Sequence, residues 1–279
     1  MNIELEVTNA CNAKCLFCPH DLSAKRGVGF MTEETFTRLI NITNPFDFQK
    51  FYFTGMGEPS LNELLPDFIS KINGKHTVVT TNGTLGGDKV RLLKEAGLTE
   101  IFFSINYTDA HQSREIMGVD FERVKESISA SISAGLRTSA LVTISKLTRP
   151  QLREIYEWAR NQGIENVYFC VGHSRGGHFQ NESIIEAHPV ISQTCAVIQW
   201  NLFVTWNGDI LLCSSDLRGE YSYGNIMDND MQYFLKLRSS QGTDNDLCRK
   251  CDCMFRYDSL TIKQILISNG VDASWLSWP

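Results

Sequence analysis

Three cysteines stand close together near the start of the chain. Cys11, Cys15 and Cys18 are spaced C-x3-C-x2-C, so one loop can present all three sulfurs to a single inorganic centre. A mononuclear zinc site would normally need a fourth protein ligand, and the nearby candidate is His20. Three thiolates can instead hold three irons of a [4Fe–4S] cube and leave the fourth iron open to a ligand that is not protein. On spacing alone, an iron–sulfur cluster, a zinc loop and a disulfide pair all remain open.

This loop resembles the defining CxxxCxxC motif of radical S-adenosylmethionine (SAM) enzymes, in which an aromatic or apolar residue, here Phe17, precedes the last cysteine. The resemblance implies that the three thiolates hold a [4Fe–4S] cluster whose open iron binds SAM. In that family an electron from the cluster splits SAM into methionine and a 5′-deoxyadenosyl radical, which removes a hydrogen atom from the substrate.

Length and composition favour a globular α/β protein with redox or metal chemistry. The 279 residues suffice for one large domain and a small appendage, and 42% of them are hydrophobic. The net charge is −6 and basic residues are scattered, which argues against nucleic acid as a partner. No signal peptide or apolar run of membrane-spanning length is present, so we expect a cytoplasmic protein without a membrane partner. In such a chain, nine cysteines indicate metal or redox chemistry.

Apolar periodicity predicts alternating strands and helices over the first two thirds of the chain. We expect strands at 3–7, 50–53, 77–81, 100–105, 138–144 and 166–171, and helices beginning near Thr32 and at 61–72, 88–96, 121–134 and 151–162. Such alternation implies a mostly parallel sheet covered by helices. The resemblance implies that the six strands form a partial (βα)6 TIM-like barrel, over residues 1–180.

The segment after the second strand resembles the family's GGE motif, which holds the SAM amino group. Gly55, Gly57 and Glu58 match it, although Met56 interrupts the paired glycines and leaves open which glycine is used. Glycines let the backbone approach a ligand, and a carboxylate complements an ammonium group. The alternative is an ordinary βα turn with a solvated glutamate.

Polar residues also end the third and fourth strands. By resemblance, Asn82, Ser104 and Asn106 line the SAM site, although Asn82-Gly83 could equally be only a turn.

The sixth predicted strand leads into a loop with side chains that can bind a polar substrate or handle protons. His173, Arg175 and His178 lie there beside two glycines. The alternative is a surface loop between domains. Cys170, just before the loop, is expected to be a packed thiol.

The last third, residues 181–279, changes character and contains a second set of thiols. Asn207-Gly208 between apolar runs predicts a two-residue hairpin turn, which would bring Cys195 and Cys213 together. Cys248 and Cys251, in CxxC spacing, would complete four thiolates for zinc or for a second [4Fe–4S] cluster.

This pattern resembles the shortened SPASM, or twitch, domain of radical SAM enzymes, a small hairpin and helix domain that carries an auxiliary [4Fe–4S] cluster. The two resemblances cover nearly the whole chain, and the match is closest to small enzymes that act on aminoglycosides and related sugars, such as 2-deoxy-scyllo-inosamine dehydrogenase. They imply SAM and two [4Fe–4S] clusters as cofactors, a polar, carbohydrate-like substrate from antibiotic biosynthesis, and a flavodoxin or ferredoxin as electron donor.

The expected reaction is dehydrogenation of a carbinol carbon, with the auxiliary cluster as electron acceptor and His173, Arg175 or His178 as proton handler. Cys253 supports a different outcome, because a thiol that returns a hydrogen atom from the opposite face would make the enzyme an epimerase. Its alternatives are a buried spectator or a cluster ligand. Peptide maturation is a third possibility, disfavoured because the chain starts directly at the first strand. From another class, the cysteines could be zinc sites of a binding protein or the clusters of an electron carrier.

Overall fold

The computed structural model describes residues 1–72, 74–185, 195–240 and 242–276, and its centre is a curved parallel sheet. Six strands pair in parallel in chain order, as the sequence predicted. They are β1 (Asn2–Leu5), β2 (Lys50–Phe53), β3 (His76–Thr81), β4 (Glu100–Ser104), β5 (Arg137–Ile144) and β6 (Asn166–Val171). The α/β class and the six-stranded partial barrel are therefore confirmed.

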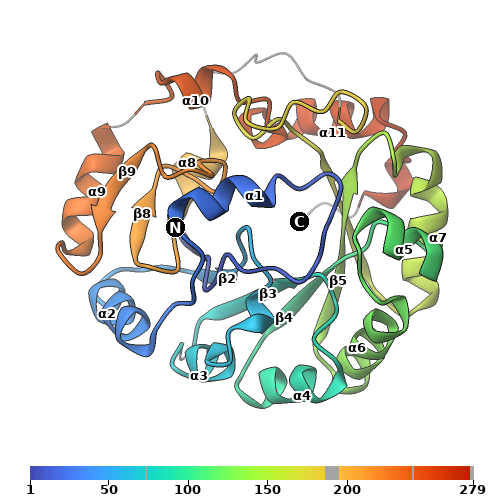
Figure 1. Ribbon diagram of the computed structural model, residues 1–279, viewed down its shortest axis with the longest axis horizontal. Helices are drawn as coiled ribbons and strands as arrows, with labels where there is room; N and C mark the ends of the chain where they lie inside the picture. Colours follow the sequence, from blue (N-terminus) through green and yellow to red (C-terminus); the bar gives the residue numbers. More distant parts are fainter. Residues whose placement is uncertain (73, 186–194, 241, 277–279) are drawn as a thin grey trace.

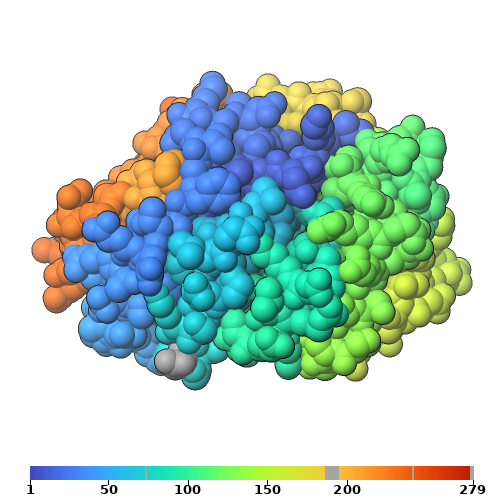
Figure 2. All heavy atoms as spheres, turned by 60° about the horizontal axis from the view of Figure 1, so that its bottom comes forward, coloured from blue at the N-terminus to red at the C-terminus, as the bar shows by residue number. Residues whose placement is uncertain are grey.

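Helices surround this sheet on its outer side (Figure 1). They are α2 (Glu33–Thr43), α3 (Leu65–Ser70), α4 (Gly87–Glu95), α5 (Ala110–Ile116), α6 (Phe121–Ser133) and α7 (Leu152–Asn161). Helix α2 begins where the sequence predicted, and Thr32 caps it, because its side chain accepts a hydrogen bond from the Thr35 amide. Figure 2 shows the successive strand–helix segments of the barrel side by side in chain order on one face, from blue through cyan to green.

The inner face of the sheet is polar and partly exposed. In β1, Leu5 is fully buried in the main core, whereas the neighbouring Glu4 stays partly exposed. Tyr52 of β2 lies within electrostatic reach of Glu4 on β1, Glu100 on β4 and Tyr168 on β6. Side chains from strands this far apart in the sheet can share a neighbour only across a curved interior. These residues therefore line the inside of the barrel.

The C-terminal region extends the same sheet beyond β1. Strand β7 (Asn201–Val204) pairs in parallel with β1, and β8 (Asp209–Leu211) and β9 (Ser222–Asn225) continue it as antiparallel strands. The remaining helices are α1 (His20–Ser23), α8 (Ala196–Trp200), α9 (Met231–Ser240), α10 (Asp246–Arg249) and α11 (Ser259–Ser268). A division of the chain into domains at about residue 180 stays a prediction.

The hairpin differs from its prediction in two ways. Residues 196–200, expected to extend the apolar strand, form helix α8 instead. The loop also has three residues, because the Thr205 amide donates to the Asp209 carbonyl across Trp206, Asn207 and Gly208. Gly208 takes a φ of 87°, which is typical of a three-residue hairpin loop that ends in a left-handed glycine.

The predicted helix at 61–72 is shorter than expected. A single 3-10 turn (Pro59–Leu61) precedes α3, and residues 62–64 separate the two. The Asn62 side chain donates to the carbonyls of Val7 and Met31 and accepts from the Leu64 amide, so it joins this connection to the first strand and stops the helix from starting earlier.

In the described part of the chain, no helix is both long and apolar enough to cross a bilayer.

Candidate active site

The three-cysteine loop follows β1 at the carboxyl end of the barrel. Two backbone hydrogen bonds attach it to the end of α5: the Lys14 amide donates to the Met117 carbonyl, and the Leu16 amide donates to the Ile116 carbonyl. Earlier in the loop, the Asn9 side-chain amide donates to the carbonyls of Ser23 and Gly27. The loop is thus held from both sides before any cofactor binds.

The thiols of Cys11, Cys15 and Cys18 lie within electrostatic reach of one another. Burial raises the pKa of the Cys15 thiol, and the neighbouring thiols of Cys18 and Cys11 raise it further. Burial raises the pKa of Cys11 to about 11. The structure therefore brings together the three thiols that the spacing predicted.

The proposed fourth zinc ligand has another partner. His20 places Nε2 2.7 Å from the Asn9 carbonyl oxygen. In the described part of the chain, no three Cys, His, Asp or Glu side chains converge as ligands of a single metal ion. A four-iron cube accepts sulfurs set much farther apart than a mononuclear ion does, so three thiols on one loop fit the cube.

The motif after β2 packs against the cysteine loop. A Cβ atom on Gly57 would lie 2.2 Å from the Thr8 carbonyl oxygen and 2.6 Å from that of Ala10, so only glycine fits there. Gly55 has a φ of 133° and packs against Glu6. Both glycines of the interrupted motif thus allow close approach, and Gly57 is the one in contact with the loop.

Glu58 is buried beneath this loop, with 2% of its surface exposed. Its carboxylate accepts hydrogen bonds from the Asn82 amide (2.7 Å), the Thr81 hydroxyl (2.8 Å) and the Ser60 amide (3.2 Å). Burial raises its pKa, and these three donors oppose that rise. Glu58 is therefore not the solvated turn residue of the alternative interpretation.

The other predicted SAM-site residues lie around the same end of the barrel. Asn82 donates from Nδ2 to the side-chain oxygen of Asn12 in the cysteine loop. Asn106 is fully buried and accepts from the Thr143 amide, whereas Ser104 and Phe17 remain partly exposed. Their contacts with SAM stay predictions.

Four thiols gather in the C-terminal region, as expected. Burial raises the pKa of Cys213 well above its usual value, and the thiols of Cys251, Cys195 and Cys248 each raise it further. The CxxC pair lies on a tight turn, in which the Cys251 amide donates to the Cys248 carbonyl. The Arg256 side chain donates to the carbonyls of Cys248 and Cys251. Four buried or half-buried thiols within electrostatic reach of Cys213 suit a fully ligated cluster.

A fifth thiol borders this set. Cys253 has 8% of its surface exposed; burial raises its pKa, and the thiols of Cys251 and Cys195 contribute to its electrostatic environment. Arg175 acts on the same thiol in the opposite direction. Cys253 thus lies between the four-thiol set and the loop that follows β6.

Arg175 occupies a position between the two thiol sets. It is the only non-glycine residue with positive φ (52°) in the described part of the chain, and such a backbone is held only by surrounding contacts. The Arg175 amide donates to His173 Nδ1, and the preceding Ser174 is anchored to Asp252, whose Oδ1 accepts from the Ser174 amide and hydroxyl at 2.8 and 2.6 Å. Burial raises the pKa of the Cys18 thiol, and the Arg175 charge partly offsets this effect.

The histidines of this loop are less favourably placed. His173 Nδ1 lies 3.3 Å from the Arg175 amide. His178 Nε2 is buried and has no hydrogen-bond partner within the described residues, so that atom is closed to a substrate in this conformation. Of the three predicted side chains, Arg175 is the one that the structure places beside both thiol sets.

Sequence reasoning missed Glu4. Its side chain lies on the inner face of β1, accepts a 2.6 Å hydrogen bond from Asn201 of β7, and lies within electrostatic reach of Arg175 and Arg238. A signal was available, because Glu4 and Glu6 alternate with Ile3, Leu5 and Val7 in a strand that would otherwise be wholly apolar. Ionisable side chains at one face of a central strand indicate a functional interior.

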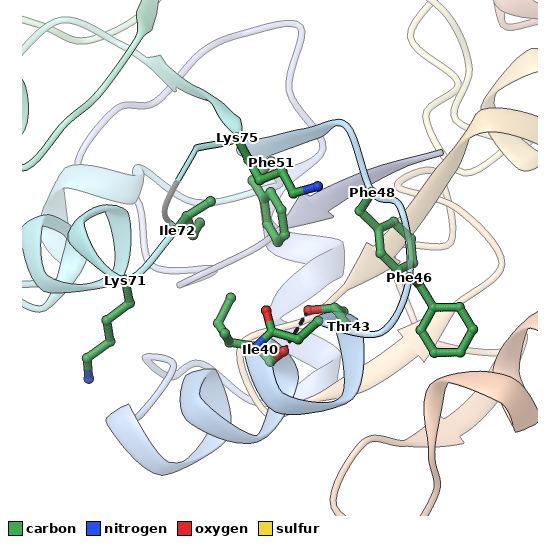
Figure 3. Close-up of a pocket in the computed structure, with 9 residues that line it drawn as sticks. Ile40, Thr43, Phe46, Phe48, Phe51, Lys71, Ile72 and Lys75 are labelled. Carbon is green, nitrogen blue, oxygen red and sulfur yellow. Dashed lines mark hydrogen bonds between the residues drawn. The ribbon is translucent and has the colours of Figure 1, made fainter.

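An apolar pocket elsewhere is not part of this site (Figure 3). Ile40, Phe46, Phe48, Phe51 and Ile72 line it, with the stems of Lys71 and Lys75 nearby. These residues belong to segments that precede β2 and β3 or start β2, so the pocket lies at the end of the barrel opposite the cysteine loop.

Comparison with known families agrees with this geometry. The family model described as the radical SAM superfamily matches residues 5–173, and the SPASM iron–sulfur cluster-binding domain matches residues 195–252. The chain belongs to the radical SAM superfamily and carries a C-terminal SPASM-type domain. Its cofactors are SAM and [4Fe–4S] clusters, with a second, auxiliary cluster in the C-terminal region.

Two solved structures show the same fold. The first is BtrN in complex with AdoMet and 2-DOIA, with a TM-score of 0.59, 21% identity, and coverage of 90% of this chain and 94% of that one. The second is anSMEcpe with bound AdoMet, with a TM-score of 0.66, 18% identity, and coverage of 84% and 80%.

The curated relatives by sequence are named differently from the two solved structures. A probable GTP 3′,8-cyclase of Sulfolobus acidocaldarius is 26% identical over 71% of this chain and 66% of its own length. Another, from Methanococcus vannielii, is 27% identical over 58% of this chain and 56% of its own length. The match therefore spans less than two thirds of the length of each of these relatives.

Proposed function

We propose that this chain is a radical SAM dehydrogenase that oxidises a carbinol carbon of a carbohydrate-like or aminocyclitol-like small molecule to a ketone. The observation that carries the proposal is the position of Arg175. Its charge acts both on Cys18 of the N-terminal loop and on Cys253 beside the C-terminal thiols. A substrate held there would be close to both cofactor sites at once.

In this proposal each thiol set has one task. Cys11, Cys15 and Cys18 hold the SAM-binding cluster, and Cys195, Cys213, Cys248 and Cys251 hold the auxiliary cluster. Bound SAM and the two clusters supply abstraction of the carbinol hydrogen atom and acceptance of one electron. Glu58, Asn82 and the backbone at Gly57 position SAM above β2 and β3.

The chain itself binds and orients the substrate. Arg175 is a guanidinium with several donors and no acceptor, so it binds the carbinol oxygen and stabilises the negative charge that develops there. Asp252 holds the Arg175 loop against the auxiliary-cluster region, through Ser174. The substrate is thereby fixed relative to both thiol sets before reaction.

The proposal of a small polar substrate does not rest on identity with a neighbour of known ligand. BtrN was crystallised in complex with 2-DOIA, but identity of 21% supports the fold alone. The relatives named GTP 3′,8-cyclase make GTP a compound that any assay should include. We further propose that a flavodoxin or ferredoxin supplies the reducing electron.

Epimerisation is a second candidate, because of Cys253. This thiol is not needed for four-cysteine ligation, and it lies within reach of Arg175. A thiol in that place could return a hydrogen atom to the substrate carbon from the opposite face.

Product analysis separates these reactions. The anaerobically loaded chain would be incubated in deuterated water with SAM, a reductant and a panel of 2-deoxy-scyllo-inosamine, myo-inositol, glucosamine, GTP and a serine-containing peptide. We expect one of the polyols to yield a product two hydrogens lighter, by mass spectrometry.

The control variants are Cys253→Ala and Cys170→Ala, each of which removes one thiol near Arg175. Ketone formation should persist in both. A product of unchanged connectivity that carries one solvent deuterium and is lost only in Cys253→Ala would identify an epimerase instead. Turnover of GTP or of the peptide alone would also contradict the proposal.

A further inference from the structure

Oxidation of a carbinol to a ketone requires a group that accepts the hydroxyl proton, and the loop after β6 does not offer a suitable one. Arg175 has no acceptor atom. His173 Nδ1 lies against the Arg175 amide, and His178 Nε2 is buried away from solvent. A carboxylate on another element that faces Arg175 can serve as the acceptor instead.

Glu4 of β1 meets this requirement. Its carboxylate is partly exposed on the inner face of the barrel and lies within electrostatic reach of Arg175. Its strand leads upward to the cysteine loop, and its other neighbour, Ser214, directly follows Cys213. Glu4 thus lies within electrostatic reach of Arg175 and beside the residue that follows Cys213.

A hydrogen-bonded chain holds this carboxylate in place. Asn2 donates from Nδ2 to Oδ1 of Asn201 at 3.1 Å, which leaves the Asn201 Nδ2 to donate to Glu4 Oε1 at 2.6 Å. The orientation of Asn201 is therefore set by its neighbour across the β1–β7 pair. Such support keeps the carboxylate at one point of the interior.

The other inward-facing carboxylates are already engaged. Glu6 is fully buried. Its carboxylate accepts hydrogen bonds from both Nη atoms of Arg26 and from the Met56 amide. Glu100 has 5% of its surface exposed and binds Ser139, His76 and Arg137 at the start of β4. Among these three, Glu4 alone remains accessible and also faces Arg175.

We propose that Glu4 is the catalytic base that accepts the hydroxyl proton while Arg175 holds the same oxygen. This inference rests on the proposed dehydrogenation. The O–H bond breaks and its proton moves to the Glu4 carboxylate; the hydrogen atom on carbon leaves to the SAM-derived radical, and one electron leaves to the auxiliary cluster. Two hydrogens and their electrons are thus accounted for, and a C=O bond remains.

The charges around Glu4 determine its pH response. Burial raises the pKa of Glu4. Hydrogen bonds from Asn201 and Ser214 lower it, as do the charges of Arg175 and Arg238. Tyr52 of β2 also lies within electrostatic reach of Glu4. The balance is a pKa above the usual value. The base form is therefore lost as pH falls through this raised pKa, and ketone formation should fall with it.

Glu4→Gln tests the proposal, because glutamine keeps the shape and the bond from Asn201 but cannot take the proton. The probe is the panel polyol that the wild-type chain oxidises, deuterated at its carbinol carbon. We expect ketone formation to drop by roughly 10²–10⁴-fold, while deuterium still appears in 5′-deoxyadenosine and a carbon-centred radical accumulates in the electron paramagnetic resonance spectrum. Glu4→Asp should restore part of the rate and the acidic limb of the pH profile.

Glu100→Gln is the matched control, since it removes an inward-facing carboxylate away from Arg175 and should leave ketone formation within a fewfold of wild type. An unchanged rate and pH profile in Glu4→Gln would overturn the proposal. Loss of deuterium transfer together with the ketone would also overturn it, because Glu4 would then act in binding or folding. A wild-type chain that makes no ketone contradicts the proposed function itself, and with it the role of Glu4.

Discussion

At the scale of single residues, close contacts decide where the cofactor loop can lie. Gly57 shows this most clearly, because the carbonyl oxygens of Thr8 and Ala10 occupy the space that a side chain would need. The Glu58 amide then donates to the Ala10 carbonyl at 2.8 Å, which joins the strand-end motif to the loop just before Cys11. A glycine in an apparently degenerate motif thus has a steric role.

Gly57→Ala should therefore displace the backbone directly before the first cysteine. The added methyl group can fit only if Thr8–Ala10 shifts, and such overpacking costs about 1–3 kcal/mol. We expect the variant to fold, to lose about four irons per chain, which is one [4Fe–4S] cluster, and to stop cleaving SAM. Iron analysis and 5′-deoxyadenosine quantification check this.

Gly242→Ala serves as the control for that variant, because its Cβ atom would have no neighbour closer than 3.9 Å. It should keep the iron content and SAM cleavage of the wild-type chain. Full iron content and normal SAM cleavage in Gly57→Ala would show that the loop tolerates the shift.

Residue roles that depend on local spacing could be predicted from the sequence, whereas those that depend on distant contacts could not. The two cysteine sets follow from C-x3-C-x2-C and CxxC. The loop that carries Arg175 is anchored through Ser174 to Asp252, 78 positions after Ser174, and no local pattern in the sequence predicts that contact. Glu4 was missed because the sequence analysis gave weight to strand ends, and its role arises from a strand face.

At the scale of elements, the parallel pair of β1 and β7 joins the C-terminal region to the barrel. The register sets Glu4 opposite Phe203 and Asn2 opposite Asn201, which is what allows Asn201 to reach Glu4. The Asn-Gly signal predicted a hairpin, but neither this pairing nor helix α8 was visible, because an apolar run can form a helix as readily as a strand. The partner of β7 is set by the whole sheet.

Leu202→Ala tests this continuity. Leu202 is fully buried on β7, so its truncation should lower the free energy of unfolding by about 2–5 kcal/mol. Because β7 belongs to the barrel sheet, we expect far-ultraviolet circular dichroism and cluster absorbance to report one shared transition in urea, shifted to lower concentration.

Leu260→Ala is the control, since that side chain is 67% exposed and its loss should change stability little. The wild-type chain could instead show two separate transitions, of which Leu202→Ala moves only one. That result would show that the hairpin region unfolds on its own.

At the scale of the whole molecule, the fold places two thiol sets on either side of one polar interior. One set follows the carboxyl end of β1, and the other gathers around the β7–β8 hairpin. The Arg175 charge acts on Cys18 and on Cys253, and Glu4 lies within electrostatic reach of Arg175. The family match accounts for the cofactors. The charged side chains near Arg175 are the basis of the proposed oxidation of a polar carbinol.

The most direct test of this account is a single-turnover measurement on the loaded chain with the polyol that it oxidises. Rapid freezing would be followed by electron paramagnetic resonance of the auxiliary cluster and by quantification of ketone and 5′-deoxyadenosine. The account predicts that reduced auxiliary cluster, ketone and 5′-deoxyadenosine appear in equal amounts. Ketone formed without reduction of that cluster, or 5′-deoxyadenosine formed without ketone, would contradict it.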